Sequence, residues 1–268
     1  MIALLVAAAS AACPLSGKDL PPSTRLEIAA QGALVAVRGA AGARLALKPE
    51  LDCSMVGNVL RIVVPDGTRD VTADVPSAIA VSVTVLRGNI EISGINGNVM
   101  ADVGAGDVQV TRVNGDVTTR SAVGTIHLSD ITGRIDAAAQ NNELRVTRTR
   151  GDVRVSNVSG TMLLEAVQAS NIMATTVTSE IVCTCSPVGP GTWEMRTHTG
   201  AVRVAVGRNV EFVATLDAPP NASRVDMSGV SQQTEGKRKV TVVRGEGGTR
   251  MLLSSFSGGV FLQDQDQR

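Results

Sequence analysis

The sequence predicts an all-β fold, a single-stranded parallel β-solenoid (β-helix) with about 18 residues per coil and a β-rich N-terminal cap. Three observations predict it. A glycine or asparagine recurs every nine residues, an aliphatic residue follows each one two positions later, and aromatic residues make up only 1% of the chain. Compact cores rely on aromatic volume. A chain with 43% hydrophobic residues and so few aromatics therefore favours a narrow interior of Val, Ile, Leu and Ala.

The nine-residue repeat runs without a gap from Gly88 to Gln168. Glycine makes up ~7% of average sequences, so this register is not a chance arrangement. Glycine and asparagine adopt a left-handed backbone most readily, and each unit is expected to open with a sharp turn. The residues predicted at these turns are Gly88, Gly97, Gly106, Gly115, Gly124, Gly133, Asn142, Gly151 and Gly160.

The apolar positions of the unit show that the true period is 18 residues. The third position is aliphatic in every unit. The fifth is large in one unit and small in the next, as in Ile92 and Ala101, and the eighth alternates in the same way, as in Ile95 and Gly104. Two unlike nine-residue halves therefore make one repeat.

This pattern has a direct physical meaning. Apolar third and fifth positions with a polar residue between them indicate a short strand with one face inward. Two strands and two turns make a coil, and coils stack by parallel pairing ~4.8 Å apart. A single coil cannot bury its own apolar side chains, so stacking creates the core. Parallel crossovers are usually right-handed, and a right-handed solenoid is expected.

Outside the strict repeat the chain is less regular. The register slips by one residue after Gly160, and the repeat phrase returns near Gly200 and Gly258. Solenoids need capped ends, and the strand-like runs before the repeat are expected to supply one cap. The predicted organisation is a signal peptide (1–12), a linker (13–23), an N-terminal β cap (24–85), the regular solenoid (86–186), irregular C-terminal coils with a cap (187–262) and a polar tail (263–268).

The first twelve residues, MIALLVAAASAA, carry no charge and are almost wholly apolar. They are too short for a membrane span of about 20 residues and resemble a signal-peptide core. Ala9-Ser10-Ala11 fits an A-x-A cleavage site. Ser10-Ala11-Ala12-Cys13 resembles a bacterial lipobox with Cys13 as the lipidated residue, although Ser10 stands where Leu is usual. A buried first strand is the alternative interpretation.

The cysteines are Cys13, Cys53, Cys183 and Cys185, and export would permit disulfides between them. If Cys13 is lipidated, Cys53 can bridge to Cys183 or Cys185 and one thiol is left over. If Cys13 is retained, a Cys13–Cys53 bridge is another option, and spacing does not choose between them. No second pair or nearby histidine makes Cys183 and Cys185 part of a zinc site.

Composition and motifs argue against several functions. Lys plus Arg and Asp plus Glu number 25 each, which argues against a nucleic-acid binder and a polybasic membrane surface. His127 and His198 belong to no catalytic or metal-ligand spacing and are expected on the surface. A glycan-active β-helix enzyme needs convergent carboxylates and aromatic platforms, and Trp193 is the only large candidate platform. The sequence thus predicts no catalytic residue, no metal and no cofactor.

Acidic residues recur after the turns, at Asp107, Asp116 and Asp152. Calcium-binding β-rolls need several ligands per turn, whereas each unit offers at most one carboxylate, so the turn preference of Asp is the favoured interpretation. At period 18, Asp116, Arg134 and Asp152 fall in one column, which predicts an exposed ion-pair ladder. A small basic cluster is also expected, on a face of mixed charge: Arg145, Arg148, Arg150 and Arg154.

Particular phrases resemble a known family. V-x-G-[DN]-V-x-V, seen in Val113-Asn114-Gly115-Asp116-Val117, resembles the bacterial "putative adhesin" β-strand-repeat family, a domain of unknown function. Residues 93–99 (SGINGNV) are similar to the related head GIN domain adhesins, and residues 247–262 resemble the closing strands of the first family. The resemblance covers about residues 30–262. It implies a β-solenoid in an exported or envelope-associated bacterial protein and supplies no catalytic residues.

These observations predict a non-catalytic, exported cell-envelope β-solenoid with a structural, adhesive or surface- and glycan-binding role. A periplasmic envelope-stress scaffold or sensor is the alternative, and a glycan-active β-helix enzyme is less favoured. The expected partners are a glycan, a cell surface or an envelope protein, with membrane contact only through a lipid anchor and no nucleic acid. The expected state is a monomer in the periplasm, on the outer membrane as a lipoprotein, or at the cell surface.

Overall fold

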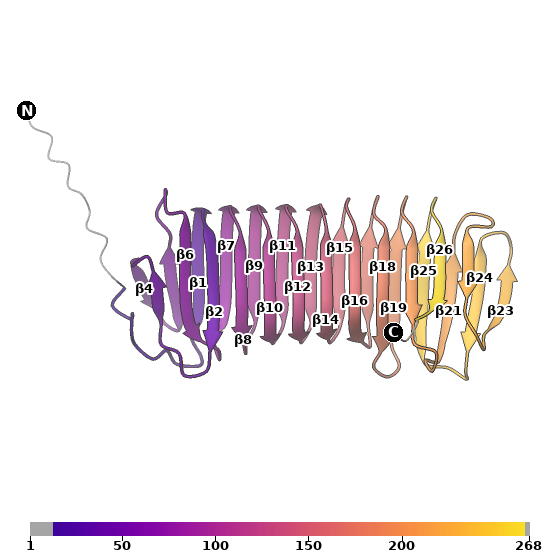
Figure 1. Ribbon diagram of the computed structural model, residues 1–268, viewed down its shortest axis with the longest axis horizontal. Helices are drawn as coiled ribbons and strands as arrows, with labels where there is room; N and C mark the ends of the chain where they lie inside the picture. Colours follow the sequence, from indigo (N-terminus) through magenta and orange to yellow (C-terminus); the bar gives the residue numbers. More distant parts are fainter. Residues whose placement is uncertain (1–12, 266–268) are drawn as a thin grey trace, which may run out of the picture.

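The computed structural model describes residues 13–265 and shows an elongated rod of β-strands (Figure 1). Its 26 strands form two mostly parallel sheets, sheet A with 14 strands and sheet B with 12. The predicted β-solenoid is confirmed. Within the described residues, no helix is long and apolar enough to cross a membrane.

Both sheets run the length of the rod. In spatial order, sheet A consists of β23 (Ser231–Glu235), β24 (Lys239–Arg244), β21 (Phe212–Asp217), β25 (Thr249–Ser255), β19 (Thr192–Thr197), β17 (Ile172–Thr176), β15 (Val153–Asn157), β13 (Ile135–Asn141), β11 (Val117–Val123), β9 (Val99–Ala105), β7 (Ala80–Arg87), β1 (Arg25–Gly32), β5 (Val59–Val63) and β4 (Cys53–Val56). Sheet B consists of β22 (Ser223–Asp226), β26 (Val260–Asp264), β20 (Val202–Val206), β18 (Ile181–Pro187), β16 (Met162–Ala169), β14 (Leu144–Arg150), β12 (Ile126–Thr132), β10 (Val108–Asn114), β8 (Ile90–Ile95), β2 (Leu34–Ala40), β6 (Asp70–Pro76) and β3 (Ala46–Lys48).

From β7 to β20 the chain alternates between the sheets, so that one strand of each makes a coil. Neighbouring strands of a sheet pair in parallel at an offset of 18 residues, as where Val108 pairs with Ile126. This confirms the predicted coil length. The offset becomes 19 where Val153 pairs with Ile172, which accommodates the extra residue after Gly160.

The two halves of a coil differ because sheet B strands contain a residue with positive φ at the seventh position of the unit. This residue interrupts the inward and outward alternation, so that the eighth residue points inward, as the buried Val113 and Ile131 do. Sheet A strands alternate without interruption, and the seventh residue points inward, as Val103 and Ala139 do. The size alternation at position eight has this cause. The interrupting residues and their φ angles are Arg112 (53°), Asp130 (56°), Arg148 (49°) and Ala166 (52°).

Large interior side chains of sheet B face small ones of sheet A. At the fifth position, Leu128 and Val146 in sheet B are fully buried, and so are Ala101 and Ala137 in sheet A. This arrangement fills the narrow interior to the density that protein cores require, almost without aromatic residues.

Polar interior residues of sheet A satisfy the turns. Asn157 Nδ2 donates to the carbonyl oxygen of Asn142 at 2.9 Å, and Ser255 Oγ donates to that of Gly200 at 2.7 Å. A buried carbonyl without a partner is costly, so these side chains stabilise the corner where one sheet passes to the other.

Eight of the nine predicted turn residues have positive φ, including Asn142 at 84°. Glycine is also needed because the turns stack closely. A Cβ added at Gly124 would overlap the carbonyl oxygen of Gly106 in the preceding coil. Gly97 is the exception, since its φ is not positive. Its requirement is steric alone, because an added Cβ would lie 2.6 Å from the carbonyl oxygen of Ile79.

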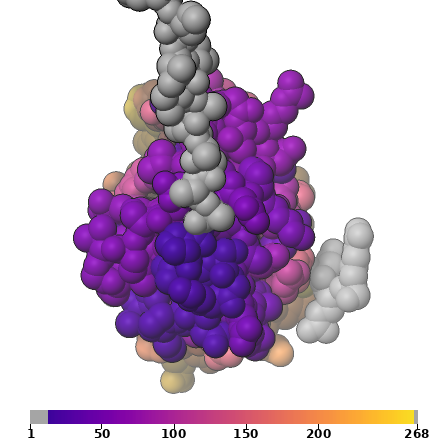
Figure 2. Space-filling model, turned by 90° about the vertical axis from the view of Figure 1, so that its left-hand side faces the viewer, coloured from indigo at the N-terminus to yellow at the C-terminus, as the bar shows by residue number. Residues whose placement is uncertain are grey.

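Antiparallel strands close both sheets at the N-terminal end of the rod and sheet A at the other end, where sheet B finishes in the parallel strand β22. At the N-terminal end, β3 pairs with β6 and β4 pairs with β5, and at the other end β24 pairs with both β21 and β23. The segment expected as a linker also belongs to this cap. Cys13 and Leu20 are buried in the core cluster, and residues coloured indigo cover this end in Figure 2.

Candidate binding groove

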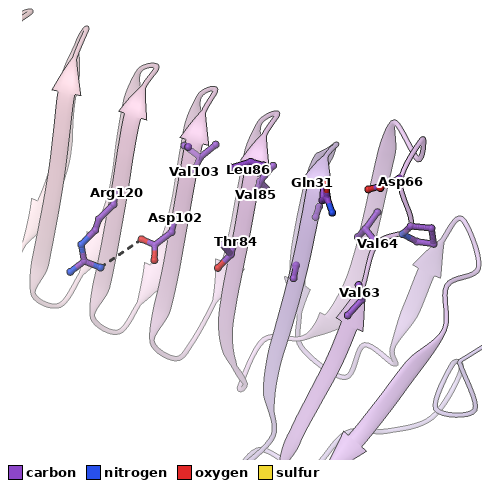
Figure 3. A pocket seen from close by; sticks show the side chains of 14 residues that line it. Gln31, Val63, Val64, Asp66, Thr84, Val85, Leu86, Asp102, Val103 and Arg120 are labelled. Atoms are coloured by element: carbon purple, nitrogen blue, oxygen red, sulfur yellow. Dashed lines mark ion pairs between the residues drawn. The ribbon is translucent and has the colours of Figure 1, made fainter.

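An open groove of about 780 Å³ lies on the outer face of sheet A. It crosses β5, β1, β7, β9 and β11 near the N-terminal end (Figure 3). No sequence motif predicted it.

The groove follows from the register of these strands. One row of outward residues runs from Val63 through Ala29, Thr84 and Asp102 to Arg120, each paired with the next across the sheet. Ala29 is the smallest of the five and leaves the hollow. The row joins two strands of the N-terminal cap to three strands of the repeat.

The walls of the groove are apolar and open to solvent. Val63 is 72% exposed and Leu86 is 58% exposed, which makes them two of the most exposed large hydrophobic residues of the described chain. Gly104 lies beside Leu86, and an added Cβ there would come within 2.6 Å of the Leu86 carbonyl oxygen. Exposed apolar surface beside a hollow is typical of a contact site.

The far end of the groove is polar. Arg120 Nη1 lies 3.7 Å from Asp102 Oδ1, with the arginine 57% exposed. This Oδ1 atom is shielded from solvent and accepts no hydrogen bond from the described residues. The groove can hold an apolar group between Val63 and Leu86, and the Asp102 side chain, 32% exposed overall, gives its other end a negative charge.

The predicted surface histidines lie far from the groove. His127 lies on β12 in sheet B, and His198 follows β19. The His198 ring stacks on Phe256 with centroids 4.7 Å apart, and the Arg238 guanidinium lies 5.9 Å from the Phe256 centroid. Sequence reasoning missed this stack because the two rings are 58 residues apart in the chain and lie on β-strand ends outside the regular repeat.

Trp193 does not serve as a sugar platform. Its side chain is fully buried, and the indole N–H donates to the carbonyl oxygen of Ala169 at 3.2 Å. No ring face is left for a ligand. The position considered in the sequence for a glycan-active cleft is thus part of the core.

The acidic residues after the turns bind backbone N–H groups of the next coil. Asp107 Oδ1 accepts from the N–H of Thr125 at 2.8 Å, and Asp116 Oδ1 accepts from that of Arg134 at 2.9 Å. The two carboxylate oxygens of Asp152 accept from the backbone N–H and the side-chain amide of Asn171. The expected ion-pair ladder is therefore a ladder of side chain to backbone hydrogen bonds. Among residues 13–265, no group of three or more His, Cys, Asp or Glu side chains is suited to a metal.

The expected basic cluster is divided by the fold. Arg145 and Arg148 lie on β14 and pair with Glu143 at 3.2 Å and Asp130 at 2.8 Å. Arg154 lies on β15 in the other sheet, beside a hollow of about 350 Å³. The mixed charged face is the interpretation that the structure supports.

Two disulfides pair the cysteines within their own regions. Cys13 is bonded to Cys53 at the N-terminal end, and Cys183 to Cys185 within β18. The bridge from Cys53 to Cys183 or Cys185 does not form, because those strands lie many coils apart along the rod (Figure 1). Disulfides persist in oxidising compartments, which favours an exported protein. The signal-peptide interpretation itself falls on residues outside the described range.

Comparisons with known proteins give little more. No protein-family model matches the chain, and neither does any curated protein. A solved structure from Clostridium sporogenes, described as a putative cell adhesion protein, is aligned over 97% of both chains at 10% identity, with a TM-score of 0.22. A TM-score this low carries no argument about fold or function.

Proposed function

We propose that this chain is a non-catalytic, exported cell-envelope solenoid that contacts an envelope protein through the groove on sheet A. The observation that carries the proposal is the pair of exposed apolar walls, Val63 and Leu86, beside the Asp102–Arg120 ion pair. Aliphatic walls with charged side chains at both ends, Asp66 at one and the Asp102–Arg120 pair at the other (Figure 3), suit a protein surface. Sugar-binding sites usually add aromatic stacking, and the groove has no aromatic residue.

The rest of the rod supports a structural or adhesive role. Both sheets are continuous. Antiparallel strands cover both sheets at the N-terminal end and sheet A at the other end, so the parallel edge left at the ends is the four-residue strand β22. Capped ends favour a monomer. The two disulfides are consistent with a location outside the cytoplasm, in an oxidising compartment.

Several features support a non-catalytic role. The carboxylates after the turns hold backbone N–H groups, Trp193 is in the core, and the His198 ring is stacked on Phe256. These residues contribute to the architecture.

The groove is tested by crosslinking the exported protein in intact envelopes. Leu86→Glu and Val63→Glu place a charge on the apolar walls, and each is expected to reduce crosslinking to the main partner at least about tenfold, the effect of losing roughly 1.4 kcal/mol of contact energy. Val177→Glu is the matched control, since Val177 is 47% exposed and lies outside the groove. Equal crosslinking by all three variants, or crosslinking only to glycan, would contradict the proposal.

Protease treatment of intact cells then separates two locations. Cleavage from outside supports an adhesive role at the cell surface. Protection until the outer membrane is opened supports the periplasmic scaffold. Catalysis is tested on a broad polysaccharide panel, and turnover of any member would overturn the non-catalytic role.

A further inference from the structure

The segment that closes the N-terminal end of the rod begins at Cys13, which the sequence pattern also marks as a candidate lipidation site. Ser10-Ala11-Ala12-Cys13 resembles a lipobox, in which the cysteine sulfur carries a lipid. In the structure that sulfur is bonded to Cys53 on β4, the edge strand of sheet A, with the two Cα atoms 4.8 Å apart. The two uses of the atom exclude each other, because a cysteine sulfur forms one bond beyond its own Cβ.

Residues 13–20 form an end plug, by which we mean the segment that lies across the first coil. The Cys13 N–H donates to the carbonyl oxygen of Leu51 at 3.0 Å, and the Gly17 N–H donates to that of Leu45 at 2.7 Å. The Leu45 N–H in turn donates to the carbonyl oxygen of Lys18 at 3.2 Å. The plug is therefore held by backbone hydrogen bonds to Leu45 and Leu51 as well as by the disulfide.

The plug also buries apolar surface. Cys13 is 5% exposed and Leu20 is 7% exposed, and both belong to the core cluster with Leu45 and Leu51. A diacylglyceryl group on the Cys13 sulfur would replace the bond to Cys53 and would add bulk where the side chain is buried. A lipid anchor would thus require the plug to leave the end of the solenoid.

We infer that Cys13 is a cystine partner rather than a lipidation site, and that the Cys13–Cys53 bond fastens the end plug after export. In this step the two thiols lose two protons and two electrons to a disulfide-carrying oxidant, which becomes a dithiol. The inference requires an oxidising compartment and does not depend on what the groove binds.

The test is a peptide map of the exported, full-length chain, prepared with thiol alkylation and without reduction. Trypsin cuts after Lys18, Arg44 and Arg61 and does not cut before Pro49. The expected result is a disulfide-linked pair, the peptide that ends at Lys18 joined to residues 45–61. A diacylglyceryl mass on the Cys13 peptide, or an alkylated Cys53, would overturn the inference. The map is indifferent to groove binding, so failure here is distinct from failure of the proposed function.

Variants supply a second readout on the same protein. Cys13→Ser, Cys53→Ser and the double variant are expected to lower Tm by the same amount, roughly 10 °C. Each variant removes the same disulfide, which closes a loop between residues 40 apart in the chain. Cys183→Ala with Cys185→Ala is the control that leaves the linked peptides in place. Loss of envelope attachment in Cys13→Ser with Tm unchanged would show a lipid site instead.

Discussion

Arg148 on β14 holds Asp130 on β12 through two hydrogen bonds of 2.8 Å, from Nε and Nη2 to the two carboxylate oxygens. The hydrogen bond from Arg148 holds the pKa of Asp130 below its usual value, and the carboxylate raises the pKa of Arg148. Both side chains are largely exposed, so the pair adds little to stability. The pair is informative because of its position in the strands: both residues have positive φ, 49° for Arg148 and 56° for Asp130. The pair marks the column at which the sheet B strands from β8 to β16 interrupt their alternation.

This column predicts a stabilising substitution. Ala166 has a φ of 52° and an exposed side chain, and a left-handed backbone costs an alanine about 1–2 kcal/mol. Ala166→Gly is expected to raise the free energy of unfolding by up to about 1 kcal/mol after the entropic cost of glycine. Ala138→Gly, in a regular strand, is the control and is expected to lower it. Trp193 is fully buried, so its fluorescence reports unfolding.

The turn column predicts the opposite response to a methyl group. Gly124→Ala is expected to cost about 3 kcal/mol or to prevent folding, because the added Cβ overlaps the Gly106 carbonyl oxygen. Gly42→Ala is the control: Gly42 also has positive φ, at 67°, but no atom lies within 4 Å of an added Cβ. Its cost is expected to be about 1 kcal/mol from backbone strain alone. Equal losses in urea unfolding would show that strain rather than overlap explains the glycines.

The ladder of hydrogen bonds from Asp side chains predicts that Asp→Asn substitutions leave stability unchanged and that calcium does not affect stability. Asp116→Asn keeps an acceptor for the Arg134 N–H and is expected to leave stability unchanged, as the natural Asn98 does for the Asp116 N–H. Asp116→Ala removes the acceptor and is expected to cost about 1 kcal/mol. Thermal unfolding in calcium and in chelator is expected to coincide. A higher Tm in calcium would restore the β-roll interpretation.

The C-terminal end predicts a pH dependence. Asp264 pairs with Arg244, and their side chains are 12% and 7% exposed. Burial by itself raises the pKa of Asp264, but hydrogen bonds from Ser228 and Arg244 outweigh it and hold the pKa below the usual 3.8. The stabilisation is therefore present above pH 3.8 and is lost as pH falls through the lower, folded-state pKa.

Asp264→Asn is accordingly expected to cost about 3 kcal/mol at pH 7, since it leaves Arg244 buried without its counter-charge. The difference from wild type should shrink below pH 4. Asp217→Asn, which alters the more exposed pair with Arg238, is the control and is expected to cost less than about 1 kcal/mol. A difference that stays constant down to pH 2 would rule out the carboxylate charge as its origin.

The sequence predicted the coil well because its signal is local. Gly106 and Gly124 mark the turns, and the interior positions follow from them. The interruption at Arg112, Asp130 and Arg148 was not predicted, because arginine and alanine have no preference for positive φ and the column holds no shared residue type. The interruption was visible in the sequence only indirectly, as the alternation between large and small residues at the eighth position of the unit.

The groove could not be predicted for a different reason. It depends on Ala29 lying between Val63 and Thr84, and β1 and β5 belong to the cap, where no repeat fixes the register. The cysteine pairing also required the fold, since only the end plug brings Cys13 to Cys53. Long-range pairing outside a repeat is not encoded in spacing.

The 18-residue offset that paired strands share from β7 to β16 has an evolutionary consequence. In this part of the rod the strands of adjacent coils pair in the same register, as β10 and β12 do, and the ends are closed by separate elements. Duplication or loss of one 18-residue gene segment would therefore lengthen or shorten the rod by a single layer, ~4.8 Å, while both caps kept their contacts. Such a molecule can change its reach in small, equal steps without having to evolve a new core.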